Sequence, residues 1–225
     1  MDLQLDLGPK LGRVSALLAH PPDAWLLYIL AHGAGAGMRH DSLESISGAL
    51  ALRGVATLRF QFPYMEKGSR RPDPPDVAEA AVRAAVRRAG ELAPELPLIA
   101  GGKSFGGRMT SGAAAKSLPG VLGLSFLGFP LHPPGRPGTS RADHLDDIEL
   151  PLLFLQGTRD VFAQLDLITS VCRRLGPRAT LHLLEGADHS FGLPKRSGRP
   201  PSAVREELAD TLVEWARSVI AGKDR

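Results

Sequence analysis

Short runs of apolar residues alternate along the chain with longer segments in which apolar positions recur every three or four residues. The runs of strand length cover residues 25–31, 55–60, 98–101, 121–126 and 150–155. Most of them are apolar at successive positions, which is typical of strands buried on both faces of a parallel sheet. Residues 13–19 and 179–184 show a more mixed pattern, as edge strands tend to do. We therefore expect a sheet of about seven strands.

Two of the intervening segments have a clear helical period. Asp76 is expected to cap a helix over residues 77–89, with Glu79 completing a capping-box-like pair and facing water. The inner stripe of this helix consists of Ala78, Ala81, Val82, Ala85 and Val86. A last helix follows Ser202, and its apolar stripe should pack on the sheet. That stripe consists of Val204, Leu208, Leu212, Trp215 and Val219.

The order of strands and helices predicts a doubly wound α/β fold, with helices on both faces of a mostly parallel sheet. We expect residues 1–225 to form a single domain, because this length supports one core and no linker-like stretch divides it. Two Pro-rich stretches, residues 61–75 and 127–143, lack a regular pattern, and each follows a strand. Ligands of open α/β sheets bind at this carboxyl-end edge, so both stretches are candidates for the walls of a site.

Composition and charge exclude several classes of function. The chain has 27 basic and 24 acidic residues, and the two signs are interspersed, so we expect a solvated surface and no nucleic-acid partner. The single cysteine, Cys172, excludes an internal disulfide and a cysteine-rich zinc site. The first residues show no signal-peptide pattern, and the longest apolar runs are far shorter than the ~20 residues that span a bilayer. We expect a cytoplasmic protein without membrane contacts, metal or cofactor.

Residues 102–106 carry the strongest chemical signal. They read Gly-Lys-Ser-Phe-Gly, directly after a predicted strand and directly before a helix-like run. In this strand–turn–helix context, G-x-S-x-G is typical of a nucleophile elbow, whose strained turn exposes the serine hydroxyl. Gly102 and Gly106 supply the small residues that the close approach of strand and helix requires. Ser104 is therefore the candidate nucleophile.

The same residues also resemble the end of a phosphate-binding loop. That motif, G-x-x-x-x-G-K-[ST], requires a glycine five residues before Gly102, where this chain has Pro97. Nucleotide binding is therefore the weaker interpretation.

A serine hydroxyl needs a base to take its proton, and the base needs a partner that orients it. In hydrolases of this fold the partners follow the serine in the order Asp or Glu, then His. Asp160 and His189 each come just after a predicted strand, in this order, and are the candidates for the partners of Ser104. Three aspartates after the preceding strand are possible substitutes for Asp160: Asp143, Asp146 and Asp147.

Residues 31–37 read Ala-His-Gly-Ala-Gly-Ala-Gly and also follow a strand. They resemble the glycine-rich oxyanion loop of esterases, and the alternative is a flexible strand–helix turn. The backbone N–H groups of Ala34 and Phe105 are the predicted oxyanion donors. His32 is expected to brace the loop and not to transfer protons.

Together, the segments at residues 31–35, 102–108 and 186–190 resemble the α/β-hydrolase superfamily, and within it the small dienelactone-hydrolase-like group. Residues 59–65 and 129–135 are similar to the branch of the testis-expressed protein and the histone-acetyltransferase-complex subunit, and to its uncharacterised bacterial relatives. The resemblance covers roughly residues 13–219. It implies Ser104, Asp160 and His189 as a catalytic triad. Lys103 departs from the family, which usually has a bulky or aromatic residue at this position.

The resemblance implies a serine hydrolase that acts on a small carboxylic ester, lactone or thioester through an acyl-enzyme. With only a short irregular stretch after the middle of the sheet, the chain has no room for a large lid, so the site should be open. We expect an acyl pocket lined by Phe62, Tyr64, Met65 and His132. The alternative is a catalytically silent, hydrolase-like protein-interaction module, because some animal relatives are thought to be scaffold subunits.

Overall fold

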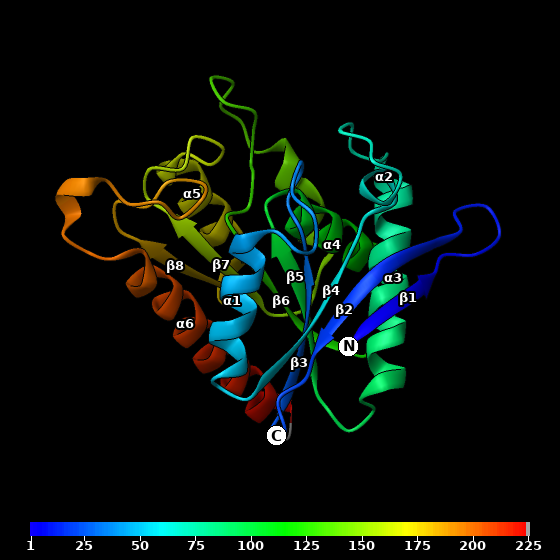
Figure 1. Cartoon of the computed structure of the whole chain (residues 1–225). Coiled ribbons are helices and arrows are strands. Elements are labelled where there is room, and N and C mark those ends of the chain that lie inside the picture. Colours follow the sequence, from blue (N-terminus) through cyan, green and yellow to red (C-terminus); the bar gives the residue numbers. More distant parts are fainter. Residues whose placement is uncertain (224–225) are drawn as a thin grey trace.

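The computed structural model describes residues 1–223 and contains one eight-stranded sheet with helices on both faces (Figure 1). The strands are β1 (Asp2–Asp6), β2 (Arg13–Ala19), β3 (Leu26–Ala31), β4 (Val55–Phe60), β5 (Leu98–Lys103), β6 (Val121–Leu127), β7 (Leu152–Gly157) and β8 (Ala179–Leu184). Their order across the sheet is β1-β2-β4-β3-β5-β6-β7-β8. All neighbours from β4 to β8 are parallel, whereas β1 and β2 are antiparallel to their partners. The predicted doubly wound, mostly parallel fold is confirmed.

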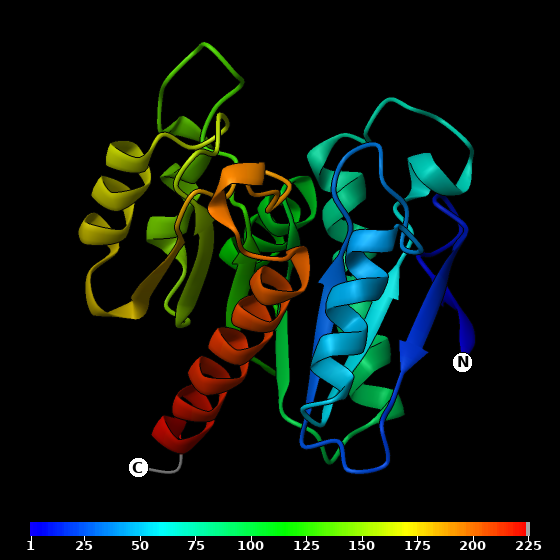
Figure 2. The same cartoon turned by 60° about the vertical axis from the view of Figure 1, so that its left-hand side comes forward.

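The helices form a layer on each face of the sheet. They are α1 (Asp41–Ala51), α2 (Pro63–Glu66), α3 (Pro75–Leu92), α4 (Phe105–Lys116), α5 (Leu165–Leu175) and α6 (Pro201–Lys223), with short 3₁₀ turns η1 (Ser140–Asp147), η2 (Gly176–Arg178) and η3 (Lys195–Ser197). Helices α1 and α6 cover one face, in front of the sheet in Figure 2, and α3, α4 and α5 pack on the other. None of the helices described over residues 1–223 has the length and apolar character that a bilayer crossing requires.

Burial explains why the central strands read as continuous apolar runs. Every residue of β3 is buried, and alternate side chains enter the two layers of the core. Leu27 and Ile29 join the cluster beneath α3 and α4, whereas Tyr28 and Leu30 join the cluster beneath α1 and α6. A strand with two apolar environments cannot show the apolar–polar alternation of a half-exposed strand.

The structure corrects the sequence interpretation at the sheet edge. β1 was not predicted, and it pairs with β2, so β2 is the second strand and not an edge strand. Only Leu5 of β1 is fully buried, because β1 itself forms the edge and exposes most of its side chains. The strand is short and has only two apolar residues, Leu3 and Leu5, among its five, so its pattern carries little weight on its own.

The predicted start of α3 was also wrong. The helix begins at Pro75 with Pro74 as its N-cap, and Asp76 lies within the first turn. A proline fits the first helical position because its fixed φ suits the helix and its missing N–H needs no acceptor. Glu79 does not face water: it is 4% exposed and lies between α3 and α4, where its carboxylate accepts a hydrogen bond from Lys116 Nζ at 2.7 Å.

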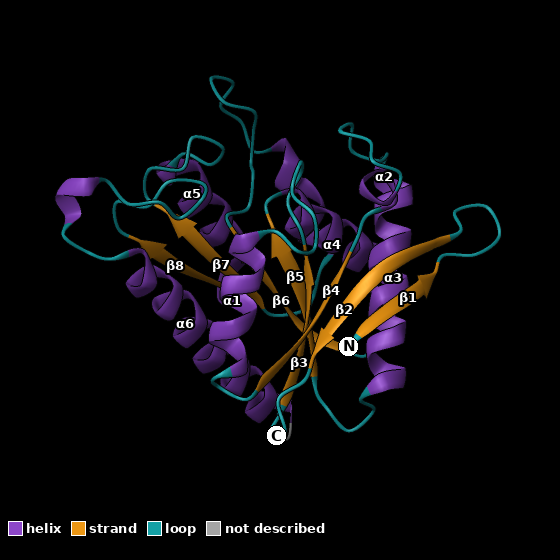
Figure 3. Cartoon of the chain, in the orientation of Figure 1, coloured by secondary structure: helices purple, strands orange, loops and turns teal. Residues whose placement is uncertain are grey.

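The loops after the parallel strands gather along one edge of the sheet (Figure 3). They include the segment after β3, the segment around α2 and residues 128–139 after β6. Between β6 and β7 the chain forms only this loop and the turn η1, so no lid domain is inserted there. The carboxyl ends of β5, β7 and β8 meet at the same edge.

Candidate active site

Ser104 lies at the sharp turn between β5 and α4. Its φ of 50° and ψ of −113° are strained for a residue with a side chain. The turn is packed tightly against the end of β3: a Cβ added at Gly102 would lie 2.4 Å from the carbonyl oxygen of Ala31, and one added at Gly106 would lie 2.6 Å from it. The two glycines therefore permit the contact that fixes the strained turn.

Three side chains from three different loops form a continuous hydrogen-bonded series. The Nε2 atom of His189 lies 2.8 Å from Oγ of Ser104. On the other side of the ring, Nδ1 lies 2.7 Å from Oδ2 of Asp160. With Nδ1–H donating to the carboxylate, Nε2 is free to accept the serine proton.

Asp160 is held by donors that the sequence interpretation did not identify. Nε2 of Gln156 donates to Oδ2 at 2.5 Å, and the N–H of Phe162 donates to Oδ1 at 2.8 Å. Gln156 is itself fixed, since its Oε1 accepts from the N–H of Phe129 at 2.9 Å. These three bonds leave the carboxylate oriented toward His189. The one available signal was a glutamine inside an apolar strand, which is fully buried here.

The loop that carries His189 is packed against the end of β7. A Cβ added at Gly157 would lie 2.3 Å from the carbonyl oxygen of Ala187, so the two segments are in direct contact. The N–H of Arg159 donates to the same carbonyl at 2.9 Å. The ring of Phe162 lies 4.4 Å from the imidazole of His189, centroid to centroid. These contacts bring the turn after β7 and the loop after β8 together.

Lys103 also contacts this loop. Its ammonium donates to the carbonyl oxygen of His189 at 2.6 Å and lies 5.3 Å from the ring centroid of Phe191. Burial lowers the pKa of Lys103 to about 8, and the negative charges of Asp160 and Asp188 oppose this shift only in part. Lys103 was noted in the sequence as an unusual residue, without a role.

The loop after β3 lies beside Ser104. A Cβ added at Gly33 would be 3.8 Å from that of Ser104. The N–H groups of Ala34 and Phe105 have no acceptor among residues 1–223, and Phe105 is the first residue of α4, where N–H groups lack helical partners. Both groups are therefore available to a negatively charged oxygen.

His32 fixes this loop from below. Its Nδ1 lies 2.8 Å from the carbonyl oxygen of Gly33, and its Nε2 accepts from the N–H of Phe62 at 3.1 Å. Burial lowers the pKa of His32 to about 4, so the ring is neutral at pH 7. A neutral ring that already uses both nitrogens braces the loop.

The four residues predicted to line an acyl pocket lie in different surroundings. Phe62 is fully buried and packs against Phe105, so it supports the site from beneath and has no surface for a ligand. Tyr64 is nearly buried, and its hydroxyl accepts from the N–H of Gly35 at 3.3 Å. Met65 lines a cavity of about 450 Å³ beside residues 35–40. His132 lines another, of about 590 Å³, beside the turn that carries Asp160.

The alternative carboxylates have other surroundings. Asp143, Asp146 and Asp147 lie in η1, where Asp146 pairs with Arg174 at 3.0 Å. Asp188 accepts from the N–H groups of Ser190 and Gly192 and so closes its own turn. Among residues 1–223, Asp160 is the carboxylate that pairs with His189. No group of three His, Cys, Asp or Glu side chains in this part of the chain could hold a metal ion.

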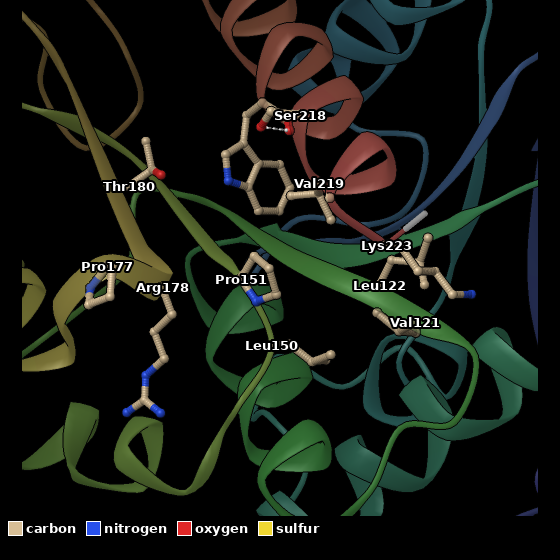
Figure 4. A pocket seen from close by; sticks show the side chains of 12 residues that line it. Val121, Leu122, Leu150, Pro151, Pro177, Arg178, Thr180, Ser218, Val219 and Lys223 are labelled. Carbon is tan, nitrogen blue, oxygen red and sulfur yellow. Dashed lines mark hydrogen bonds between the residues drawn. The ribbon is translucent and has the colours of Figure 1, made fainter. Parts of the chain in front are cut away.

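An apolar pocket of about 550 Å³ lies at the opposite end of the strands (Figure 4). It is formed where β6, β7 and β8 begin and where α6 ends, and Trp215, Leu122 and Pro151 form much of its wall. The titratable side chains that line it are those of Arg178 and Lys223. The lining that the described part of the chain provides contains no histidine, cysteine or carboxylate that could activate its hydroxyls, and the hydrogen-bonded series of Ser104 lies at the other edge.

Comparison with known proteins gives consistent results. A family model described as an alpha/beta hydrolase domain matches residues 24–217. A serine hydrolase homologue from Coxiella burnetii has a TM-score of 0.75 and 20% identity, over 94% of this chain and 97% of that one. A serine hydrolase without a lid from Xanthomonas campestris has a TM-score of 0.74 and 22% identity, over 96% and 94%. A dienelactone hydrolase from Anabaena variabilis has a TM-score of 0.75 and 18% identity, over 96% of each chain.

Proposed function

The chain belongs to the alpha/beta hydrolase family, and from this premise we propose that it is a serine hydrolase that cleaves a small carboxylic ester, lactone or thioester. The observation that carries the proposal is the series Ser104–His189–Asp160, with contacts of 2.8 and 2.7 Å at a strained serine. These are the groups that acyl transfer requires: a nucleophile, a base and a residue that orients the base.

The first half of the reaction forms an acyl-enzyme. His189 takes the proton of Ser104 at Nε2 while Oγ attacks the carbonyl carbon of the substrate. The N–H groups of Ala34 and Phe105 donate to the resulting oxyanion, and the loss of one such donor typically costs about 2.7–4 kcal/mol of transition-state stabilisation. The imidazolium then gives its proton to the leaving oxygen or sulfur as the bond to the acyl carbon breaks.

The second half regenerates the enzyme. His189 takes a proton from water, and the hydroxyl oxygen attacks the acyl carbon. When the second tetrahedral intermediate collapses, the proton returns to Oγ of Ser104 and the carboxylic acid leaves. Asp160 remains ionised throughout and stabilises the imidazolium at each step. No step requires a metal or cofactor.

The open edge of the sheet favours a small substrate. Because no lid domain lies between β6 and β7, a long acyl chain would find few apolar walls around Ser104. The cavity beside Met65 adjoins the loop after β3 and the cavity beside His132 adjoins the turn of Asp160, and neither is lined by Ser104 or His189. We therefore expect short acyl groups to be turned over faster than long ones. We also expect the enzyme to act in the cytoplasm, as a single domain.

Labelling with a fluorophosphonate tests the nucleophile. The wild-type protein should be labelled and Ser104→Ala should not, whereas Ser117→Ala, at an exposed serine beyond α4, should be labelled as the wild type is. Labelling that persists in Ser104→Ala contradicts the assignment. Hydrolysis of a panel of p-nitrophenyl esters and thioesters then identifies the bond. A wild-type protein that is neither labelled nor active on the panel would favour the protein-interaction module.

A further inference from the structure

The side chain of Lys103 occupies an unusual position for a charged group. Its ammonium is inserted between the carboxyl end of β6 and the loop that carries His189. A Cβ added at Gly128, directly after β6, would lie 3.1 Å from Nζ and 3.5 Å from Nδ1 of His189. The ammonium and the imidazole are therefore neighbours on the side of the ring that faces Asp160.

The contacts of this ammonium are few. Its hydrogen-bond acceptor is the carbonyl oxygen of His189, at 2.6 Å, and its other contact is the ring of Phe191. Within residues 1–223, no carboxylate lies within ion-pair distance of Nζ, although the charges of Asp160 and Asp188 act on it from farther away. A desolvated ammonium without a paired carboxylate costs stability, as its lowered pKa indicates.

A group that costs stability and is still present at a site calls for a functional explanation. The hydrogen bond from Lys103 links two segments that are far apart in the sequence. Its acceptor is the carbonyl of the proposed base, His189, and Lys103 directly precedes the proposed nucleophile, Ser104. A fixed distance between Nζ and this carbonyl therefore fixes the backbone of His189 relative to that of Ser104. Charge-assisted hydrogen bonds are roughly twice as strong as neutral ones, so the charged form holds the loop best.

We propose that Lys103 is a positioning residue, whose ammonium holds the carbonyl of His189 and so keeps the imidazole within hydrogen-bond reach of Ser104. The inference rests on the proposed function. It assigns a role to the residue that precedes the nucleophile, where this chain departs from the superfamily it resembles.

The ammonium loses its charge in an accessible pH range, which gives the first test. The pKa of Lys103 is about 8, and the charged or titratable groups that face it are Asp160, Asp188 and His189. The rate of fluorophosphonate labelling of the wild type should fall as pH rises from 7.5 to 10, because the neutral amine donates a weaker hydrogen bond. Lys103→Arg keeps a charge throughout this range and should show no such fall.

Removal of the charge gives the second test. Lys103→Met has a similar length and no ammonium, and we expect its labelling rate at pH 7.5 to be 10- to 100-fold lower than that of the wild type, with no fall toward pH 10. Its midpoint of thermal unfolding at pH 7.5 should be equal to or higher than that of the wild type, because no charge is buried. Lys10→Met, at an exposed lysine in the turn between β1 and β2, should behave as the wild type does.

The two readouts separate positioning from a structural role. The folded pKa of Lys103 lies below its ordinary value of 10.5, so the unfolded state binds more protons between pH 8 and 10.5. The stability of the wild type relative to Lys103→Met should therefore rise with pH in the range where its labelling rate falls. A structural residue would change both quantities in the same direction.

Several results would overturn the inference. One is a wild-type labelling rate that does not fall above pH 8, which needs no variant and so holds even if a variant fails to fold. Another is Lys103→Met that is labelled at the wild-type rate, and a third is a variant whose stability and labelling rate fall together. In these cases the wild type is still labelled at Ser104, and the proposed hydrolase function stands. A wild type that is not labelled at any pH removes the proposed function and this inference with it.

Discussion

The carboxylate of Asp160 offers the sharpest test of the geometry, because its replacement by an amide of the same shape reverses one hydrogen bond. Both oxygens of Asp160 accept: Oδ2 from Gln156 and from His189, and Oδ1 from the N–H of Phe162. In Asp160→Asn, one of these positions becomes an NH₂ group. Phe162 presents a fixed backbone donor, whereas the side-chain amide of Gln156 can turn away, so the amide oxygen belongs at the Oδ1 position. The NH₂ group then faces His189 and displaces the Gln156 donor.

The consequence is a change of tautomer. An NH₂ group at the Oδ2 position donates to Nδ1 of His189, so the ring proton moves to Nε2, which faces Ser104. The ring can then no longer take the serine proton. A wrong tautomer of this kind costs about 10⁴-fold in kcat, or about 5.4 kcal/mol at 1.36 kcal/mol for each factor of ten. The free energy of unfolding should change by less, about 1–3 kcal/mol, because the shape is kept and only the Nε2 donor of Gln156 loses its acceptor.

Ester hydrolysis at saturating substrate measures kcat, and urea denaturation measures stability. The expected result is a loss of about 10⁴-fold in kcat with a nearly unchanged KM, since the amide does not alter the surface that the substrate meets. Asp143→Asn is the matched control: it makes the same chemical change at an exposed aspartate of η1 and should retain wild-type activity. A kcat of Asp160→Asn within tenfold of the wild type would refute the reasoning, as would an equal loss in Asp143→Asn.

Three further predictions concern the scaffold of the site. Gly106→Ala introduces a Cβ at 2.6 Å from the carbonyl oxygens of Ala31 and His32, so it should lower stability by about 1–3 kcal/mol and abolish fluorophosphonate labelling by displacing the turn. His32 has a pKa of about 4 in the folded protein against an ordinary value of 6.5, so between these pH values the unfolded state binds more protons. The free energy of unfolding should therefore decrease as the pH is lowered, by up to about 3 kcal/mol from this group. Urea denaturation at pH 7 and pH 4.5 measures this fall, which should be smaller in His32→Asn. Leu212→Ala, at a fully buried position of α6, should lower the free energy of unfolding by about 2–5 kcal/mol without changing the KM of the folded enzyme.

The local sequence pattern was sufficient to predict the central strands of the sheet. Strands such as β3 and β7 are buried on both faces, so their apolar runs are continuous and unmistakable. The turn at Ser104 was also recognisable in the sequence, because it needs small residues two positions before and two positions after the serine. The placement of Asp160 and His189 near Ser104 followed from the fact that parallel strands end at the same edge, and their order is that of hydrolases of this fold.

Side-chain contacts between different elements could not be predicted from the local sequence pattern. Glu79 has the spacing of a solvent-facing residue on α3, but α4 packs over it and Lys116 pairs with its carboxylate. Gln156 and Lys103 are single polar residues at the ends of buried strands. Gln156 contacts Asp160 in the turn after its own strand, four residues on, whereas Lys103 contacts the carbonyl of His189, 86 residues away.

The sequence by itself determined the central strands, most of α3 and α6, and the edge of the sheet at which Ser104, Asp160 and His189 lie. Tertiary structure alone decided that β1 closes the edge beyond β2, that Glu79 is buried, and that the Lys103 ammonium contacts the loop of His189. The physical reason is the distance along the chain over which each determinant acts. Periodicity and turn chemistry act over a few neighbouring residues, whereas the burial and the hydrogen-bond partner of a side chain can depend on a distant segment, as Lys103 and the carbonyl of His189 show at a separation of 86 residues.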